Sequence, residues 1–204
     1  MRYIFTQIFK EMSNLNIRPG SAAAKAFAAK RVLTMKKTNP DKLIKRMVKK
    51  GAERGGNQGG IGDMFLFQYD PKYKNNEKIL PYYDRFPLII MFNHGSKYTL
   101  GINFHYLPYS DRVIFLEALR ILGPDKSLVN DDYALDNITY KNIKQVTSDV
   151  EYWKPSIKRY LNKHISGRLI KVHPEEWDLI LLLPIERFVR ARRARVFTES
   201  RAKY

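Results

Sequence analysis

The chain has 204 residues, 44% of them hydrophobic and 13% aromatic, which is enough for an apolar core and excludes wholesale disorder. It has no cysteine, which excludes disulfides, thiol nucleophiles and thiolate zinc sites, and its four histidines form no H-E-x-x-H spacing. Thirty-seven Lys and Arg against twenty Asp and Glu give a formal net charge of +17 at pH 7, which favours a polyanionic partner. No cofactor is expected.

The positive charge is concentrated at the two ends of the chain. Residues 1–62 hold fourteen Lys and Arg against three Asp and Glu, and residues 184–204 hold seven against two. The middle, residues 63–183, holds sixteen against fifteen. We therefore predict a basic N-terminal arm over 1–50, a Gly-rich linker over 51–62, a core over 63–183 and a basic C-terminal arm over 184–204. Such arms bind phosphate backbones, anionic membranes or acidic proteins, or simply form a solvated surface.

The N-terminal arm is predicted to be helical. Its first residues, MRYIFTQIFKEM, are interrupted by polar groups, so no signal peptide is expected and the protein is expected inside a cell or in a particle assembled there. Ser21 is an N-cap candidate for an alanine-rich helix that ends at Thr38, and Pro40 suits the start of a second helix, DKLIKRMVKK. That helix has one apolar stripe and a cationic remainder. Membrane-surface helices share this pattern but usually add bulky aromatic residues, so no membrane partner is expected.

The segment GAERGGNQGGIG, residues 51–62, contains six glycines. A phosphate-binding P-loop needs Gly-Lys-Ser/Thr at the start of a helix, so that the lysine and the hydroxyl reach the phosphates. Here no lysine follows the glycines, and the next residues, MFLFQYD, are strand-like. The segment is therefore predicted to be a flexible linker.

The core is predicted to be a small SH3-like or OB-like antiparallel β-barrel with a helical insertion over about 110–166, so the fold class is α+β. A helix is expected from Ser110 or Asp111 to Leu122, and a second one in PSIKRYLNKHI, ending at Gly167. The second and third strands should form a hairpin, and a corner at 173–177 should join the last two. Five strands are expected in chain order: 64–70, 86–92, 98–108, 168–172 and 178–184.

Paired carboxylates are the first candidates for catalysis. Asp131-Asp132 and Glu175-Glu176 are adjacent in sequence, which tends to point neighbouring side chains apart. The first pair lies in a polar loop and the second at the predicted corner beside Trp177. Neither pair predicts a catalytic site.

Two further candidates involve a metal and a histidine. Asp63, Asp70 and Lys72 could be combined into a nuclease-like magnesium site, but Lys72 follows a proline turn and only residue type supports the match. His105 is expected to face outward from a strand, with no sequence-local partner. The aromatic residues of the strands are assigned to core packing rather than to base stacking. The chain is therefore predicted not to be an enzyme.

Arginine dominates the C-terminal arm, IERFVRARRARVFTESRAKY, which is also predicted to be helical. Arginine forks suit bidentate contacts with phosphates or carboxylates, and arginine is also enriched at protein–protein interfaces. The residues predicted to contact an anion are the basic ones of the two arms: Lys36, Lys37, Lys42, Lys45, Arg46, Lys49, Lys50, Arg190, Arg192, Arg193 and Arg195.

Four blocks of the sequence carry a resemblance to a known family. They are LPYYDRFPLIIMF (80–92), LGINFHYLPYSDR (100–112), KPSIKRYLNKHI (154–165) and the tail PEEWDLILLLPIERF with ARVFTESR. Together they resemble a virion protein of large contractile-tailed bacteriophages, of the kind labelled DNA end protector protein. The resemblance implies a minor structural protein that meets the end of the packaged genome and guards it against host exonucleases.

Two functions stay open at this point. Basic arms that hold phosphates would bind double-stranded DNA ends independently of sequence, with an affinity that falls steeply with salt. Arms that clamp acidic neighbouring subunits would instead make the protein a tail, baseplate or neck connector with no direct DNA role. In both cases we expect a virion protein assembled in the host cytoplasm, in several copies within a symmetric particle and in contact with other virion proteins.

Overall fold

The structure is a computed structural model. It describes residues 3–18, 22–35, 60–122, 143–145, 147, 151–172, 176–183 and 185–202. The predicted second basic helix, most of the Gly-rich linker and the Asp131-Asp132 pair lie outside these ranges.

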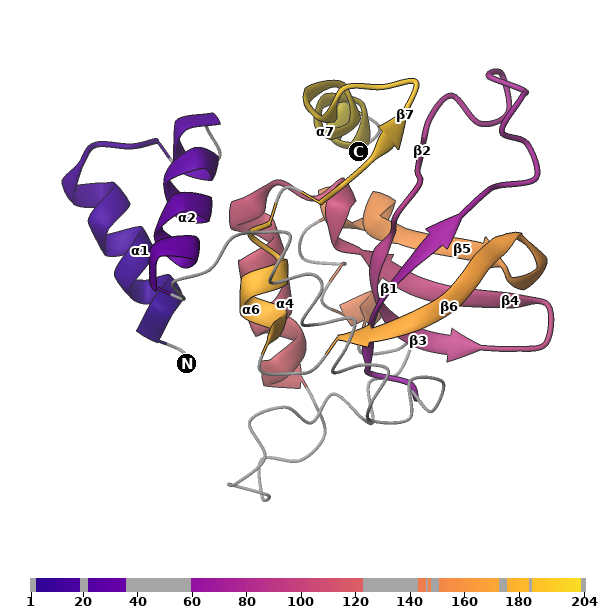
Figure 1. The fold of residues 1–204 in the computed structure, drawn as a ribbon, viewed down its shortest axis with the longest axis horizontal. Coiled ribbons are helices and arrows are strands. Elements are labelled where there is room, and N and C mark those ends of the chain that lie inside the picture. Colours follow the sequence, from indigo (N-terminus) through magenta and orange to yellow (C-terminus); the bar gives the residue numbers. More distant parts are fainter. Residues whose placement is uncertain are drawn as a thin grey trace.

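A five-stranded antiparallel sheet forms the centre of the molecule, with the strand order β5-β4-β3-β1-β6 (Figure 1). Its strands are β1 (Met64–Tyr69), β3 (Leu88–His94), β4 (Tyr98–Asn103), β5 (Ile157–Leu161) and β6 (Ile165–Val172). A second sheet pairs β2 (Tyr83–Asp84) with β7 (Phe188–Val189). The predicted hairpin of the second and third strands is confirmed as β3 and β4.

Strands β5 and β6 are the two edges of the sheet, yet only a 3₁₀ turn, Asn162–His164, separates them in the chain. The backbone N–H of Leu161 donates to the Tyr69 hydroxyl (3.3 Å), and the N–H of Asp70 donates to the carbonyl of His164 (2.9 Å). The sheet therefore curls until its edges meet at one end. No ladder joins β5 to β6 among the described residues, so the predicted closed barrel is not found.

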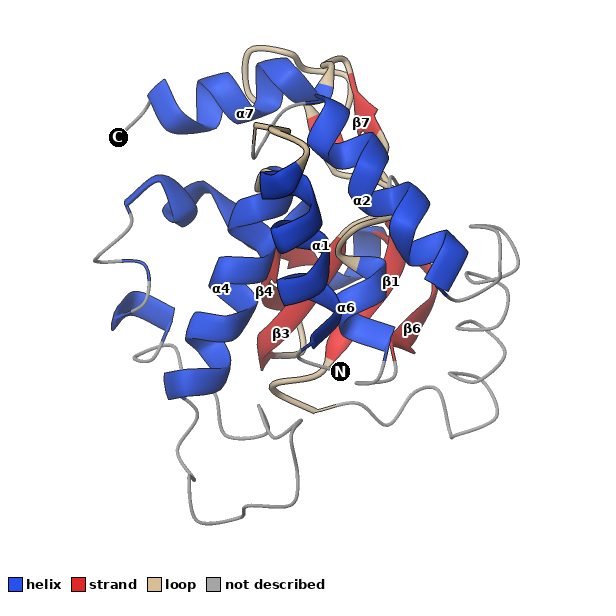
Figure 2. Ribbon diagram, turned by 90° about the vertical axis from the view of Figure 1, so that its left-hand side faces the viewer, coloured by secondary structure: helices blue, strands red, loops and turns tan. Residues whose placement is uncertain are grey.

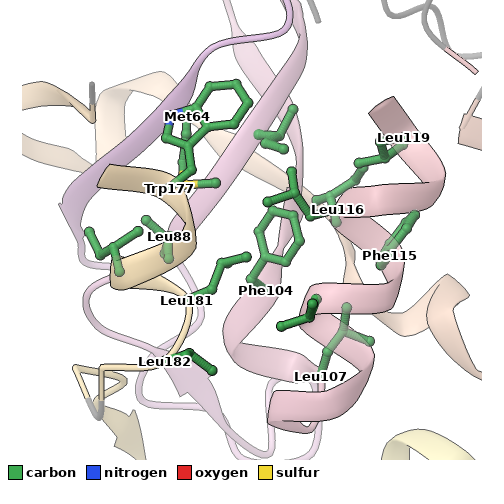
Figure 3. Packing of buried hydrophobic residues seen from close by; sticks show 14 of the residues in the cluster. Met64, Leu88, Phe104, Leu107, Phe115, Leu116, Leu119, Trp177, Leu181 and Leu182 are labelled. Carbon is green, nitrogen blue, oxygen red and sulfur yellow. The ribbon is translucent and has the colours of Figure 1, made fainter. Parts of the chain in front are cut away.

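Both faces of the sheet are buried, because successive strand residues point to opposite sides. Inside the curl, one apolar cluster contains Phe65, Phe67 and Tyr160. On the other face, Met64 and Leu88 join a larger cluster with α4 (Tyr109–Leu122) and α6 (Trp177–Ile180). Figure 3 shows Trp177 and Leu181 on one side of this cluster and the α4 residues Phe115, Leu116 and Leu119 on the other.

The N-terminal helices α1 (Tyr3–Asn14) and α2 (Ala22–Met35) form a hairpin beside α4 and α6 (Figures 1 and 2). Arg31 holds both carboxylate oxygens of Glu11 at 2.5 Å, which ties one helix to the other. Ile8, Met12, Ala24 and Ala28 belong to the same apolar cluster as the sheet. The helix predicted to follow Ser21 is therefore confirmed, and it is docked on the core through small apolar residues.

Two predicted elements are wrong. The segment 155–165 is not a helix, because Ile157–Leu161 pairs with β4 as strand β5, preceded by a 3₁₀ helix, Glu151–Ser156. The segment 178–184 is not a strand: Trp177–Ile180 forms the short helix α6, and Trp177, Ile180 and the following Leu181 are buried. Both segments contain apolar residues at spacings compatible with a helix and with a strand, so tertiary contacts decided between the two structures. The helical insertion thus ends before residue 157.

The strand predicted over 98–108 ends early. Strand β4 stops at Asn103, whose side-chain oxygen accepts from the N–H of His105 (2.9 Å) and caps the 3₁₀ helix Phe104–Tyr106. His105 is therefore completely buried and does not face outward from a strand. In the described ranges no helix is long and apolar enough to span a membrane.

Candidate nucleic-acid interface

A groove of about 340 Å³ opens between the segment that joins β1 to β2, residues 70–82, and strand β5. Tyrosines dominate its lining, and we call it the tyrosine groove. Its aromatic lining residues are Tyr69, Tyr73, Tyr82, Tyr83, Tyr106 and Tyr160. The remaining lining residues are Pro71, Lys72, Leu80, Pro81, Asp84, Lys158, Arg159 and Leu161.

Three of the tyrosines are fixed in place by packing and hydrogen bonds. The rings of Tyr69 and Tyr160 meet edge to face at 4.9 Å, and Tyr106 meets Phe188 of β7 in the same way at 5.2 Å. Asn103 Nδ2 donates to the Tyr160 hydroxyl (3.0 Å). Burial raises the pKa of Tyr69, Tyr106 and Tyr160, so these rings remain neutral at physiological pH.

At the floor of the groove lies a buried pair formed by Asp84 and His105. The carboxylate of Asp84 is 2.6 Å from His105 Nδ1, and both side chains are almost fully buried. Asn103 Nδ2 donates to the same carboxylate at 3.2 Å, and the N–H of Phe86 donates to it at 3.1 Å. Burial on its own would raise the pKa of Asp84, but His105 and these hydrogen bonds outweigh it and hold the pKa below its ordinary value.

This Asp–His pair is closed to substrates. The second ring nitrogen of His105, Nε2, is buried and has no hydrogen-bond partner in the described part of the chain. A general base must lie within hydrogen-bond reach of the proton it removes. His105 does not line the groove, so the pair serves to hold β2 against the 3₁₀ helix that carries Tyr106.

Cations surround the groove. Lys72, Lys158 and Arg159 line it directly, and Lys158 Nζ lies 3.9 Å from the centroid of the Tyr106 ring. Among the lining residues only Asp84 is acidic, and its charge faces His105. The groove is therefore an aromatic site with a net positive border, which suits an anionic ligand with a flat ring.

The arginine-rich C-terminal segment runs along this site. Strand β7 pairs with β2, and α7 (Arg193–Ala202) follows it at the top of Figure 1. The guanidinium of Arg190 donates to the carbonyl of Leu80, which lines the groove, at 3.0 Å. The segment predicted as a helical C-terminal arm is thus packed on the core through β7 and through Val196, which is fully buried. Its helix spans Arg193–Ala202, and Phe188–Val189 is not helical because it pairs with β2.

The predicted anion-contacting arginines have different environments. Arg193 contacts the buried carboxylate of Glu186, which also accepts from the Tyr109 hydroxyl (2.9 Å) and lies 3.7 Å from the buried Arg112. The guanidinium of Arg190 donates to the carbonyl of Leu80. Arg192 and Arg195 are exposed, and Arg195 pairs with Glu199 one turn along α7 at 2.5 Å.

The remaining predicted contacts lie in the first arm. Lys36, Lys37, Lys42, Lys45, Arg46, Lys49 and Lys50 are outside the described residues, so they stay a prediction. Of the predicted anion-contacting residues, the structure therefore places Arg190 beside the tyrosine groove, and it does not describe the N-terminal cations.

The catalytic candidates do not converge. Asp63 and Asp70 flank opposite ends of β1, where Asp63 pairs with Lys171 and Asp70 with Lys74, each at 2.7 Å. Lys72 lines the groove instead. No group of three or more His, Cys, Asp or Glu suited to a metal ion occurs within the ranges that the structure describes. The glycines lead into strand β1 rather than a helix, which agrees with the rejection of a P-loop.

Sequence reasoning missed the tyrosine groove. Its residues come from four separate segments that meet only because the sheet curls and β2 pairs with β7. A signal was present in the thirteen tyrosines of the chain and in the adjacent pair Tyr82-Tyr83, which follows a proline outside any predicted strand. Aromatic residues outside strands are less readily explained by core packing.

These features define a small α+β protein whose accessible chemistry is cationic and aromatic, the combination that meets phosphate backbones and nucleobases. The family model described as phage T4 terminal DNA protecting protein matches residues 21–202, and the chain belongs to this family. The family resemblance drawn from the sequence blocks is thereby confirmed. No curated protein and no solved structure matches the chain at a significant level.

Proposed function

We propose that this protein binds the ends of double-stranded DNA in a phage virion and shields them from exonucleases, without catalysis and independently of sequence. Membership of a DNA-protecting family over residues 21–202 carries this proposal. The formal charge of +17 supports it, because a protein that contacts only phosphates needs cations and no base-specific readout. The contacts would come from the first arm, Lys36 to Lys50, and from exposed arginines of the C-terminal segment.

The core that presents these cations is proposed to be an open variant of an SH3-like barrel. The strand order β6-β1-β3-β4-β5 and the three-residue link between the edge strands support this assignment. A strongly curled sheet keeps the segment 70–82 and strand β5 on one side, which is where the groove lies. The barrel would therefore act as a rigid support for the DNA-facing surface.

A structural connector remains the second candidate. Ile114 on α4 is 56% exposed and Leu15 after α1 is 60% exposed, and both lie on the helical side, away from the sheet. Single exposed apolar residues do not by themselves mark an interface. The exposed Arg192 and Arg195 support a protein partner as well, because arginine is enriched at protein–protein interfaces. Under this hypothesis the protein would sit in several copies among tail, neck or baseplate proteins, and its basic arms would clamp acidic subunits.

A comparison of linear and circular DNA separates the two candidates. Full-length protein would be titrated against blunt linear duplex and closed circular duplex of the same sequence over a salt series, and each complex would be challenged with an exonuclease. The end-protection proposal expects protection of linear DNA and an affinity that falls by several log units per log unit of salt. Equal binding of circles and ends without protection, or no binding at physiological salt, would favour the connector.

A charge-reversal variant tests the first arm in the same assay. Lys45→Glu, Arg46→Glu and Lys49→Glu together should abolish DNA retention, because three phosphate contacts are replaced by repulsion. The matched control, Lys45→Arg with Lys49→Arg, keeps the charge and should bind like the wild type. Unchanged binding in the reversed variant would remove the first arm from the interface.

A further inference from the structure

We propose that the tyrosine groove holds one unpaired nucleotide at the terminus of the bound DNA, with its base against the tyrosine rings and its phosphate beside the cations at the border. This inference rests on the proposed function. It adds a mechanism by which an end is distinguished from duplex interior, since a duplex offers an unpaired base most readily at its terminus.

The size of the groove supports a single nucleotide. Its volume of about 340 Å³ lies at the small end of the range for small-molecule pockets, about 300 to 1,000 Å³. A base with its sugar and phosphate fits such a space, whereas a base pair with two backbones does not. Duplex interior would therefore pass over the groove, and only a displaced or overhanging nucleotide could enter it.

The aromatic lining supplies stacking without sequence preference. Tyr73 is 45% exposed with Lys72 Nζ 5.2 Å from its centroid, and Tyr82 and Tyr83 are half-buried, so part of each ring is accessible from the groove. Behind them Tyr69, Tyr106 and Tyr160 are buried and fixed by edge-to-face contacts. Since every base has a π-face, such a platform accepts any terminal nucleotide, as a sequence-independent end protector requires.

The charge of the groove selects an anion over a peptide. Lys72, Lys158 and Arg159 contribute three cations, and the one acidic lining residue, Asp84, is buried against His105. Proline-rich peptides also dock in aromatic grooves, but the cationic residues such peptides often carry would be repelled here. A nucleotide combines the flat ring with the negative charge that this lining complements.

The path of the adjoining duplex is consistent with this placement. Arg190 holds Leu80 at the groove and lies 6.0 Å from the centroid of the Tyr83 ring. Arg192 and Arg195 follow on the same segment with exposed side chains. A terminal nucleotide in the groove would place the next phosphates near these arginines, which joins the groove and the C-terminal segment into one interface.

The test uses a fluorescent base at the end of the DNA. Full-length protein would be mixed with duplexes that carry 2-aminopurine in a one-nucleotide 3′ overhang, in a one-nucleotide 5′ overhang, or at an internal paired position. We expect quenching for at least one overhang and none for the internal position, and about ten-fold tighter binding of that overhang than of a blunt end. The two overhang arms identify which strand supplies the nucleotide.

Tyrosine variants assign the effect to the groove. Tyr73→Ala with Tyr82→Ala should remove the quenching and the ten-fold preference, while blunt linear DNA is still bound. Tyr73→Ala alone removes one exposed ring and provides a second readout if the double variant is unstable. Ile114→Ala is the control, because Ile114 is 56% exposed on α4 and does not line the groove.

The outcomes are distinct. Binding and protection of linear DNA with no overhang quenching, or with quenching unchanged in the groove variants, would overturn this inference and leave the proposed function standing. Failure of the wild type to bind any linear DNA would overturn both. Loss of quenching in the groove variants but not in Ile114→Ala would establish the site.

Discussion

Asp84 is the residue on which the floor of the tyrosine groove depends, because its carboxylate receives hydrogen bonds from Asn103, from the N–H groups of Phe86 and Arg187, and faces His105. Asp84→Asn should lower the free energy of unfolding at pH 7 by about 1 to 3 kcal/mol, because it replaces a buried carboxylate that accepts several hydrogen bonds with an amide whose nitrogen cannot accept. Denaturant unfolding of both proteins at pH 7 measures this difference. A loss well below about 1 kcal/mol would contradict a hydrogen-bonded carboxylate at this position.

The same carboxylate sets a pH dependence with a definite sign. The pKa of Asp84 is lower in the folded than in the unfolded protein, so its stabilising contribution is fully present above the unfolded value of about 3.9 and is lost as the pH falls through the folded value. The stability difference between wild type and Asp84→Asn should therefore shrink below about pH 4. A difference that stays constant from pH 7 to pH 3 would argue against the lowered pKa.

Gly101 on β4 is required by a close approach between strands. A Cβ atom at this position would lie 2.6 Å from Ile89 Cδ1 and 3.0 Å from the carbonyl oxygen of Ile90. Gly101→Ala should therefore destabilise the protein by about 1 to 3 kcal/mol through overpacking. Gly95→Ala is the control, since its nearest neighbour would be at 3.7 Å, and the two midpoints of denaturation give the comparison.

At the scale of elements, α7 carries arginines with two different tasks. Arg193 contacts the buried Glu186, whereas Arg195 is exposed and pairs with Glu199 along its own helix. Arg193→Ala should lower stability by about 1 to 3 kcal/mol, because it removes a charged partner of a buried carboxylate. Arg195→Ala should leave the unfolding midpoint unchanged and reduce the salt slope of DNA binding by about one unit. Equal effects of the two substitutions on stability would contradict this division.

Local pattern identified most elements but missed those that depend on distant partners, namely β5, α6 and the pair formed by β2 and β7. The strands β1, β3, β4 and β6 and the helices α2 and α4 follow from apolar periodicity, turn residues and caps, all of which act within a few residues. Ile157–Leu161 has apolar residues at both helical and strand spacing, and it becomes β5 because β4 offers an unpaired edge. Residues 178–183 have the composition of a strand, but they do not pair with β6 at the edge of the sheet.

The candidate site also has one part that the sequence predicts and one part that it does not. Its charge was predictable, since Lys and Arg counts need no structure, and Arg192 and Arg195 are exposed as an anion contact requires. The groove was not predictable, because Tyr73, Tyr106 and Tyr160 are far apart in the chain and come together only in the curled sheet. More than fifty residues separate Tyr106 from Tyr160. The structural role of Arg193 was also hidden, since its partner Glu186 is one of only two acidic residues in the basic segment 184–204.

For the whole molecule, the charge of +17 makes salt act in opposite directions on the unbound and the DNA-bound protein. Without DNA, self-repulsion disfavours the compact state, so raising the salt from about 20 to 200 mM should raise the melting temperature by screening it. With linear DNA at about a hundred times its dissociation constant, binding should add about 2.7 kcal/mol, or roughly 5 to 10 °C. That increment should shrink as salt rises, because the affinity rests on phosphate contacts. Thermal scans of full-length protein with and without blunt duplex measure both trends. A DNA-induced shift that is independent of salt would mean that phosphate neutralisation is not the source of the affinity.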